Sequence, residues 1–173
     1  TACIWMGNRG AVRTQNIVFD GSSTGDMPTK NMTIRSTETL RAQSTFRVIG
    51  NVRNVTLRNM TIECNSRKGD TYSRAGVLLQ NFYDPAEPKG QSFIHDFTVD
   101  NCTIIATNSE LSDGIIQHVS VFGEEGLPRD LGSTGIVISN NTIHSQPRGI
   151  FFMNILKGSI ANNRFYVNLP IGG

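Results

Sequence analysis

The feature that most constrains this sequence is a six-residue phrase that recurs along the chain. In this phrase an apolar residue is followed by a variable residue, Asn, another variable residue, a polar residue and a second apolar residue. It occurs at 57–62, 99–104, 138–143 and 160–165, with a shortened copy at 31–34. The last two copies are 22 positions apart and the others are farther apart, as insertions would make them. Such internal repetition predicts a solenoid of stacked coils.

Each repeat divides into three short apolar segments, which predict three strands per coil. Alternating apolar residues within the segments place one set of side chains inside and the other outside. We expect the following strands, coil by coil: 3–7, 16–19 and 31–35; 45–49, 54–57 and 60–64; 75–80, 96–99 and 102–106; 114–119, 135–138 and 141–144; 149–153, 158–161 and 163–167.

Equivalent apolar positions in successive coils would form continuous interior columns. The clearest predicted column consists of Ile34, Ile62, Ile104, Ile143 and Phe165. The Asn of each phrase lies where the chain should bend between the second and third strands, since Asn tolerates a left-handed conformation. We expect its amide to bond to the Asn above and below. The predicted ladder consists of Asn31, Asn59, Asn101, Asn140 and Asn162.

This pattern predicts an all-β protein, a right-handed single-stranded parallel β-helix of about five coils with loop insertions. Charged residues are only 17% of the 173-residue chain, and the charge of +2 is too small to favour nucleic acid as a partner. The longest apolar runs are too short for membrane insertion. We treat 1–173 as one domain. Both ends look cut from a longer chain, so more coils or domains are expected.

Three cysteines, Cys3, Cys64 and Cys102, show no metal-ligand spacing, and we expect them to be small buried hydrophobes. One disulfide remains an alternative. No cofactor or metal is expected, and the chain lacks an Asp-rich calcium repeat, which leaves only an incidental Ca²⁺ in a loop as an alternative.

Binding residues are expected in the insertions, because loops on a rigid scaffold usually carry function. The predicted insertions are 21–30, 65–74, 82–94, 107–112 and 122–133. Within them we select residues that combine charge with aromatic character as binding candidates: Arg67, Lys68, Tyr72, Tyr83, Glu124 and Arg129.

An enzymatic alternative is a polysaccharide lyase or glycoside hydrolase. A lyase needs a base beside a group that neutralises the substrate carboxylate, and a hydrolase needs two carboxylic acids about 5–10 Å apart. The candidate acids and bases are Lys68, His95, Asp113, His118 and Glu124. No carboxylate cluster recurs in one column, so we select no catalytic residue. The outward column of the first strands instead reads Arg47, Leu78, Ile116, Phe151, which suits a covering loop or protein.

The repeat also carries a resemblance. Residues 16–25, 30–36, 46–50 and 54–62, and above all 135–166, resemble the β-helix repeat of very large secreted surface proteins of gliding and related Gram-negative bacteria. The broader neighbour is the pectate-lyase-like superfamily. The resemblance implies a secreted or cell-surface location, export by the type IX route and an adhesin or stalk role. It supplies no catalytic residue, because no catalytic arrangement matches residue by residue.

From the repeat and the resemblance we expect a non-enzymatic segment of a secreted or cell-surface bacterial protein, serving as a scaffold for adhesion. Its loops would contact surface glycans or another protein. The lyase or hydrolase is the first alternative. A substrate or partner carried in a secretion assembly is the second.

Overall fold

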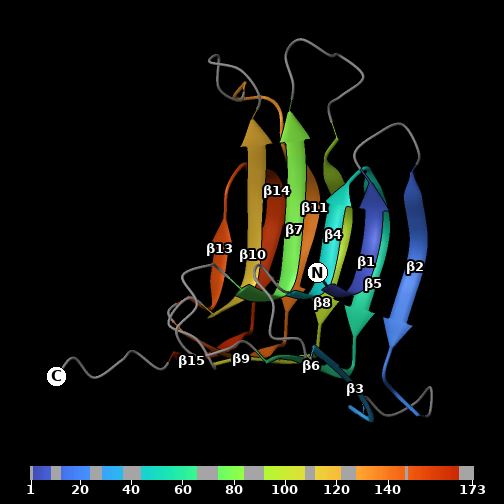
Figure 1. The fold of residues 1–173 in the computed structure, drawn as a ribbon, viewed down its shortest axis with the longest axis vertical. Coiled ribbons are helices and arrows are strands. Elements are labelled where there is room, and N and C mark those ends of the chain that lie inside the picture. The colour runs from blue at the N-terminus through green and yellow to red at the C-terminus, as the bar shows by residue number, and fades with distance from the viewer. Residues whose placement is uncertain are drawn as a thin grey trace, which may run out of the picture.

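The fold is known from a computed structural model, which describes residues 2–8, 13–23, 29–36, 44–65, 74–83, 92–107, 112–121, 128–146 and 148–167. In these residues the chain forms three sheets of five parallel strands each. Figure 1 shows the strands of each sheet side by side, with the chain progressing across them from blue to red.

The first sheet contains β1 (Ala2–Asn8), β4 (Ser44–Gly50), β7 (Arg74–Tyr83), β10 (Ser112–Val121) and β13 (Ile150–Phe152). The second contains β2 (Thr14–Asp20), β5 (Val52–Arg58), β8 (Ile94–Asp100), β11 (Ser133–Ser139) and β14 (Ile155–Ala161). The third contains β3 (Met32–Ser36), β6 (Met60–Cys64), β9 (Thr103–Ala106), β12 (Thr142–Ser145) and β15 (Arg164–Val167).

Each coil contributes one strand to each sheet, and every strand pairs in parallel with its equivalents in the neighbouring coils. The chain is therefore a right-handed parallel β-helix of five coils, as the repeat predicts. Each expected strand overlaps an observed one, so the division into coils is confirmed. Membrane-spanning helices are absent from the part of the chain that the structure describes.

The core lies inside the three sheets and is built from registered apolar columns. The predicted column Ile34–Ile62–Ile104–Ile143–Phe165 is confirmed by the pairing of β3, β6, β9, β12 and β15. Its three central members are fully buried. A second column runs through Phe46, Val77 and Ile115 in the first sheet. Stacking at about 4.8 Å brings these side chains into contact from coil to coil.

The bend between the second and third strands carries the residues that we call the outer asparagines: Asn59, Asn101, Asn140 and Asn162. All four have a left-handed backbone, with φ between 48° and 57°. Asn101 Nδ2 donates to Asn59 Oδ1 over 2.9 Å, and Asn59 Nδ2 donates to Asp20 Oδ1 over 3.0 Å. Asn140 Nδ2 donates to Asp100 Oδ1 over 2.8 Å rather than to Asn101, so the predicted asparagine-to-asparagine bond is replaced at this coil. The side chains of the outer asparagines are half-buried or exposed.

Asn31, the fifth predicted member, lies elsewhere. Gly21 occupies the bend of the first coil, where its N–H donates to the Arg58 carbonyl and Asp20 pairs with Arg58. Asn31 is exposed and donates to Ser23 Oγ. The insertion of this coil follows the bend residue, which separates the bend from the Asn that precedes β3.

A second set, which we call the inner asparagines, consists of Asn141 and Asn163. Asn141 is 1% exposed and lies in the inward column of Met60 and Cys102. Its Oδ1 accepts from the Cys102 N–H over 2.8 Å, while its Nδ2 donates to the Val99 carbonyl and to Asn163 Oδ1. Asn163 Nδ2 donates to the Ile138 carbonyl. These amides satisfy backbone groups at the bend that would otherwise be buried without partners.

The coil at the C-terminal edge is more open than the central coils. Its strands β13, β14 and β15 each end a sheet. Apolar side chains on it remain accessible: Ile160 is 53% exposed and Phe165 is 46% exposed. Ile136, Phe152 and Ile155 line a hollow at this edge. Where neighbouring coils cover both sides, the equivalent positions are fully buried.

Candidate functional site

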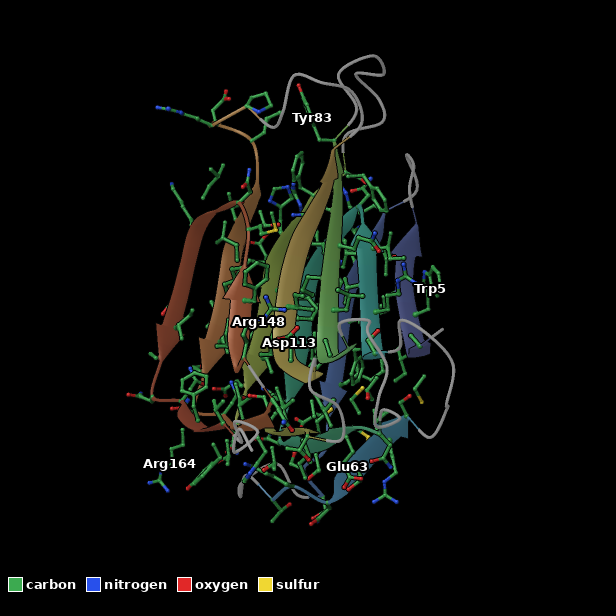
Figure 2. The ribbon with its side chains drawn as sticks, turned by 60° about the vertical axis from the view of Figure 1, so that its left-hand side comes forward. Trp5, Glu63, Tyr83, Asp113, Arg148 and Arg164 are labelled. Carbon is green, nitrogen blue, oxygen red and sulfur yellow. The ribbon has the colours of Figure 1, made fainter. Side chains whose placement is uncertain are left out.

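The structure describes few of the predicted binding residues. Arg67, Lys68, Tyr72 and Glu124 lie outside the described residues. Tyr83 ends β7 and is 7% exposed, so in this position it offers little surface for a ligand. Arg129 is exposed in the turn before β11, and Figure 2 shows Tyr83 at the upper end of the coil stack.

The candidates for acid and base chemistry are also separated. Lys68 and Glu124 lie outside the described residues, and the His118 side chain is not described either. His95 lies on β8 in the second sheet, while Asp113 is at the start of β10 in the first sheet. The described candidates therefore belong to different faces of the helix.

Asp113 forms a bidentate ion pair with Arg148. Arg148 Nε donates to Oδ1 over 2.8 Å and Nη2 donates to Oδ2 over 2.9 Å, and Figure 2 shows the two side chains meeting. The carboxylate is fully buried. Burial raises the pKa of Asp113 above its usual value, although the Arg148 guanidinium opposes the rise. The pair links the fourth coil to the fifth.

Other described carboxylates are similarly engaged. Arg58 Nε donates to Asp20 Oδ2, and Arg35 forms an ion pair with Glu63. Asp100 accepts from the Ser139 hydroxyl and the Asn140 amide. A glycoside hydrolase needs one carboxyl that can donate a proton and a second that can attack or activate water. These carboxylates serve the packing of one coil on the next.

The outer face of the first sheet carries the surface that we call the aromatic stripe: Trp5, Arg47, Leu78, Ile116 and Phe151. These residues are registered partners across β1, β4, β7, β10 and β13. Trp5 is 55% exposed, whereas Ile116 in the middle is 7% exposed. Trp5 is therefore the most accessible member of the stripe, and Figure 2 shows Trp5 projecting outward from the sheet.

Each aromatic end of the stripe contacts a guanidinium. Arg47 Cζ lies 4.6 Å from the centroid of the Trp5 ring, and Arg148 Cζ lies 4.3 Å from that of Phe151. Arg47 Nη2 also donates to Gln80 Oε1 over 2.8 Å. Burial lowers the pKa of Arg47, and the guanidinium stays charged. These contacts fix the orientation of both rings, and cations over aromatic faces contribute modest stabilisation.

The outer face of the third sheet is more polar. Thr33, Thr61, Thr103 and Thr142 form one registered file, and Lys30 Nζ donates to Thr103 Oγ1 over 3.2 Å. Beside this file, His144 and Tyr166 stack with ring centroids 4.7 Å apart. The file combines hydroxyls with flanking charged and aromatic groups.

Comparison of the chain with protein-family models, curated proteins and solved structures finds no match. Within the described ranges, no three His, Cys, Asp or Glu side chains gather as a metal site would require. Cys3 is exposed, Cys64 and Cys102 are buried, and no disulfide joins these three described cysteines. The prediction of small buried cysteines is therefore confirmed for two of them and wrong for Cys3.

Proposed function

We propose that this chain is a non-enzymatic glycan-contact scaffold, a segment of a secreted or cell-surface protein of the adhesin type. The observation that carries the proposal is the aromatic stripe. Trp5 is largely exposed, and a registered guanidinium holds it on a sheet whose strands are fixed by continuous parallel pairing. Flat aromatic rings in fixed orientations suit the apolar faces of sugar rings, since they bury area at little conformational cost.

The arginine pairing of three described carboxylates supports contact rather than hydrolysis. Asp20, Glu63 and Asp113 are each paired with an arginine. The secreted location and the type IX export route belong to the proposal through the resemblance of residues 135–166.

The experiment uses Trp5 as a reporter, because the chain contains one tryptophan. Tryptophan emission is recorded while neutral and uronate polysaccharides are added one at a time. A glycan that stacks on Trp5 changes the emission, and Trp5→Ala weakens its binding, measured by calorimetry, by about threefold to tenfold. Tyr166→Ala is the matched control, since it removes a half-exposed aromatic ring from the third sheet.

Ultraviolet absorbance of unsaturated products and release of reducing ends are followed in the same mixtures. Steady product formation would overturn the non-enzymatic proposal in favour of a lyase or hydrolase. Binding by no polysaccharide in the panel would overturn glycan contact.

A further inference from the structure

The outer face of the second sheet carries a row of polar and basic side chains across all five coils. Gln15, Arg53, His95, Thr134 and Lys157 are registered partners on β2, β5, β8, β11 and β14. They point outward, since the preceding residues of the central strands, Val52 and Ile94, are fully buried. The row crosses the strands, with one side chain about every 4.8 Å. We call it the basic row.

The charges of the basic row remain available to a ligand. The ion pairs among the described residues use Arg35, Arg58 and Arg148. Arg53 and Lys157 are exposed and belong to none of these pairs. Arg13 precedes β2 at the same end of the sheet, and its Nε donates to Asn51 Oδ1 over 3.4 Å.

The pKa of His95 is affected by the positive charges of the row. Burial lowers the pKa of His95 first, and the charges of Arg53 and Arg13 lower it further, while Asp96 acts in the opposite direction. Its Nδ1 lies 2.8 Å from Thr134 Oγ1. That contact ties the third coil to the fourth and leaves Nε2 as the ring nitrogen that can meet a ligand. A bound anion would favour the protonated form of His95.

Two further files of polar groups run beside the basic row. Asn16, Asn54 and Asp96 form one exposed file with a left-handed backbone, and a 2.8 Å amide hydrogen bond joins Asn54 to Asn16. The next outward file consists of small side chains, three of them hydroxyls: Val18, Thr56, Thr98, Val137 and Ser159. A polymer on the basic row would therefore have amides and hydroxyls beside it, together with the Asp96 carboxylate next to His95.

We propose that the basic row binds an anionic polysaccharide that lies across the strands, with its carboxylates or sulfates on Arg53, His95 and Lys157. The neighbouring amides and hydroxyls would form hydrogen bonds with the sugar hydroxyls of the polysaccharide. A phosphate backbone does not require such partners. The row is one side chain wide and the net charge of the chain is +2, which fits poorly with the many phosphate contacts of nucleic-acid binding. This inference rests on the proposed glycan-contact function and names its ligand class.

The test measures binding of polygalacturonate by calorimetry at low and high salt, with neutral dextran and a single-stranded oligonucleotide as comparison probes. We expect polygalacturonate to bind, and its affinity to fall as the salt concentration rises. Dextran and the oligonucleotide should bind much more weakly. Arg53→Gln and Lys157→Gln each reduce affinity by about threefold to fivefold, as expected for exposed charge contacts. Arg164→Gln, which removes an exposed cation from the third sheet, changes affinity little.

The pH dependence supplies an independent readout. Affinity for polygalacturonate increases as pH falls from about 8 to about 5.5, because His95 gains a proton beside the bound carboxylates. His95→Gln removes this increase. Arg13, Arg53 and Asp96 are the charged groups that act on the His95 ring.

Equal affinity of the Arg53→Gln/Lys157→Gln double variant and the wild-type protein would overturn the inference. Stronger binding of the oligonucleotide would replace the polysaccharide with nucleic acid as the ligand class. Glycan binding that depends on Trp5 and not on Arg53 or Lys157 would leave the proposed function standing and remove only this inference. Absence of all glycan binding would remove both.

Discussion

The outer and inner asparagines use the same side chain for different purposes. The outer set occupies the bend because Asn adopts the left-handed backbone, and its amides face water in part. The inner pair lies inside the coil, where Asn141 is 1% exposed and contacts three neighbouring groups. One set therefore supplies backbone conformation and the other supplies buried hydrogen bonds. The two should differ in how strongly substitution destabilises the fold.

The largest effect is expected for Asn141→Leu. The substitution leaves the Cys102 N–H and the Val99 carbonyl buried without the amide that satisfies them. An unsatisfied buried group costs about 1–3 kcal/mol, so the free energy of unfolding should fall by about 3 kcal/mol. Urea denaturation measures the change. Asn140→Gly, at the adjacent outer position, is the control, and an equal loss in both would contradict the distinction between the two sets.

Asn101 separates backbone conformation from hydrogen bonding in the outer set. Asn101→Leu should lower the free energy of unfolding by about 1–3 kcal/mol, since Leu is strained at φ 48° and the bond to Asn59 is lost. Asn101→Gly keeps the left-handed conformation accessible and should cost about 1 kcal/mol or less. Chemical denaturation of both variants gives the comparison. Equal losses would mean that the amide, and not the backbone, stabilises the bend.

Asp20 gives the outer ladder a pH dependence. Hydrogen bonds from the Asn59 amide, from Ser22 and from Arg58 hold the pKa of Asp20 well below its ordinary value of 3.8. A depressed pKa stabilises the folded state above the ordinary value, and this contribution is lost as pH falls toward the folded pKa. Thermal unfolding of wild type and Asp20→Asn between about pH 2 and pH 6 should show a flatter acid slope in the variant. Identical slopes would exclude Asp20 as the source.

The smallest effect is expected for Asn162→Gly. Asn162 is exposed in the last coil and has φ 57°, which glycine adopts without strain. The free energy of unfolding should change by about 0.5 kcal/mol or less. A loss as large as that of Asn141→Leu would mean that position in the stack matters less than the residue itself.

The sequence predicts the coils well because apolar alternation and stacking impose the same columns on every repeat. Ile62, Ile104 and Ile143 fall in one column as the pattern requires. The sequence pattern does not predict the inner asparagines, because in an Asn-Asn pair it assigns the first Asn to the bend and the second to an ordinary strand position. A polar side chain in the inward column of Met60 and Cys102 was the available signal.

The Asn31 prediction was wrong because the recurring phrase marks the start of the third strand, and in the first coil an insertion separates that start from the bend. The site was harder to predict than the fold. Most of the predicted binding residues lie in insertions outside the described residues. The basic row is hard to predict because insertions of unequal length separate the second strands, so its members recur at no fixed interval.

Strands at the edge of the stack should open more readily than strands that have neighbours on both sides. In the described strands, β14 and β15 pair on one side only, whereas β5 and β8 have neighbours on both sides. Since each coil of a solenoid gains stability from its neighbours, amide hydrogen exchange should be slowest in the second to fourth coils and faster toward both ends of the stack. The exchange rates would then form a gradient along the axis of the β-helix, with the fifth coil exchanging through openings that leave the Asn141 bonds to Cys102 and Val99 closed.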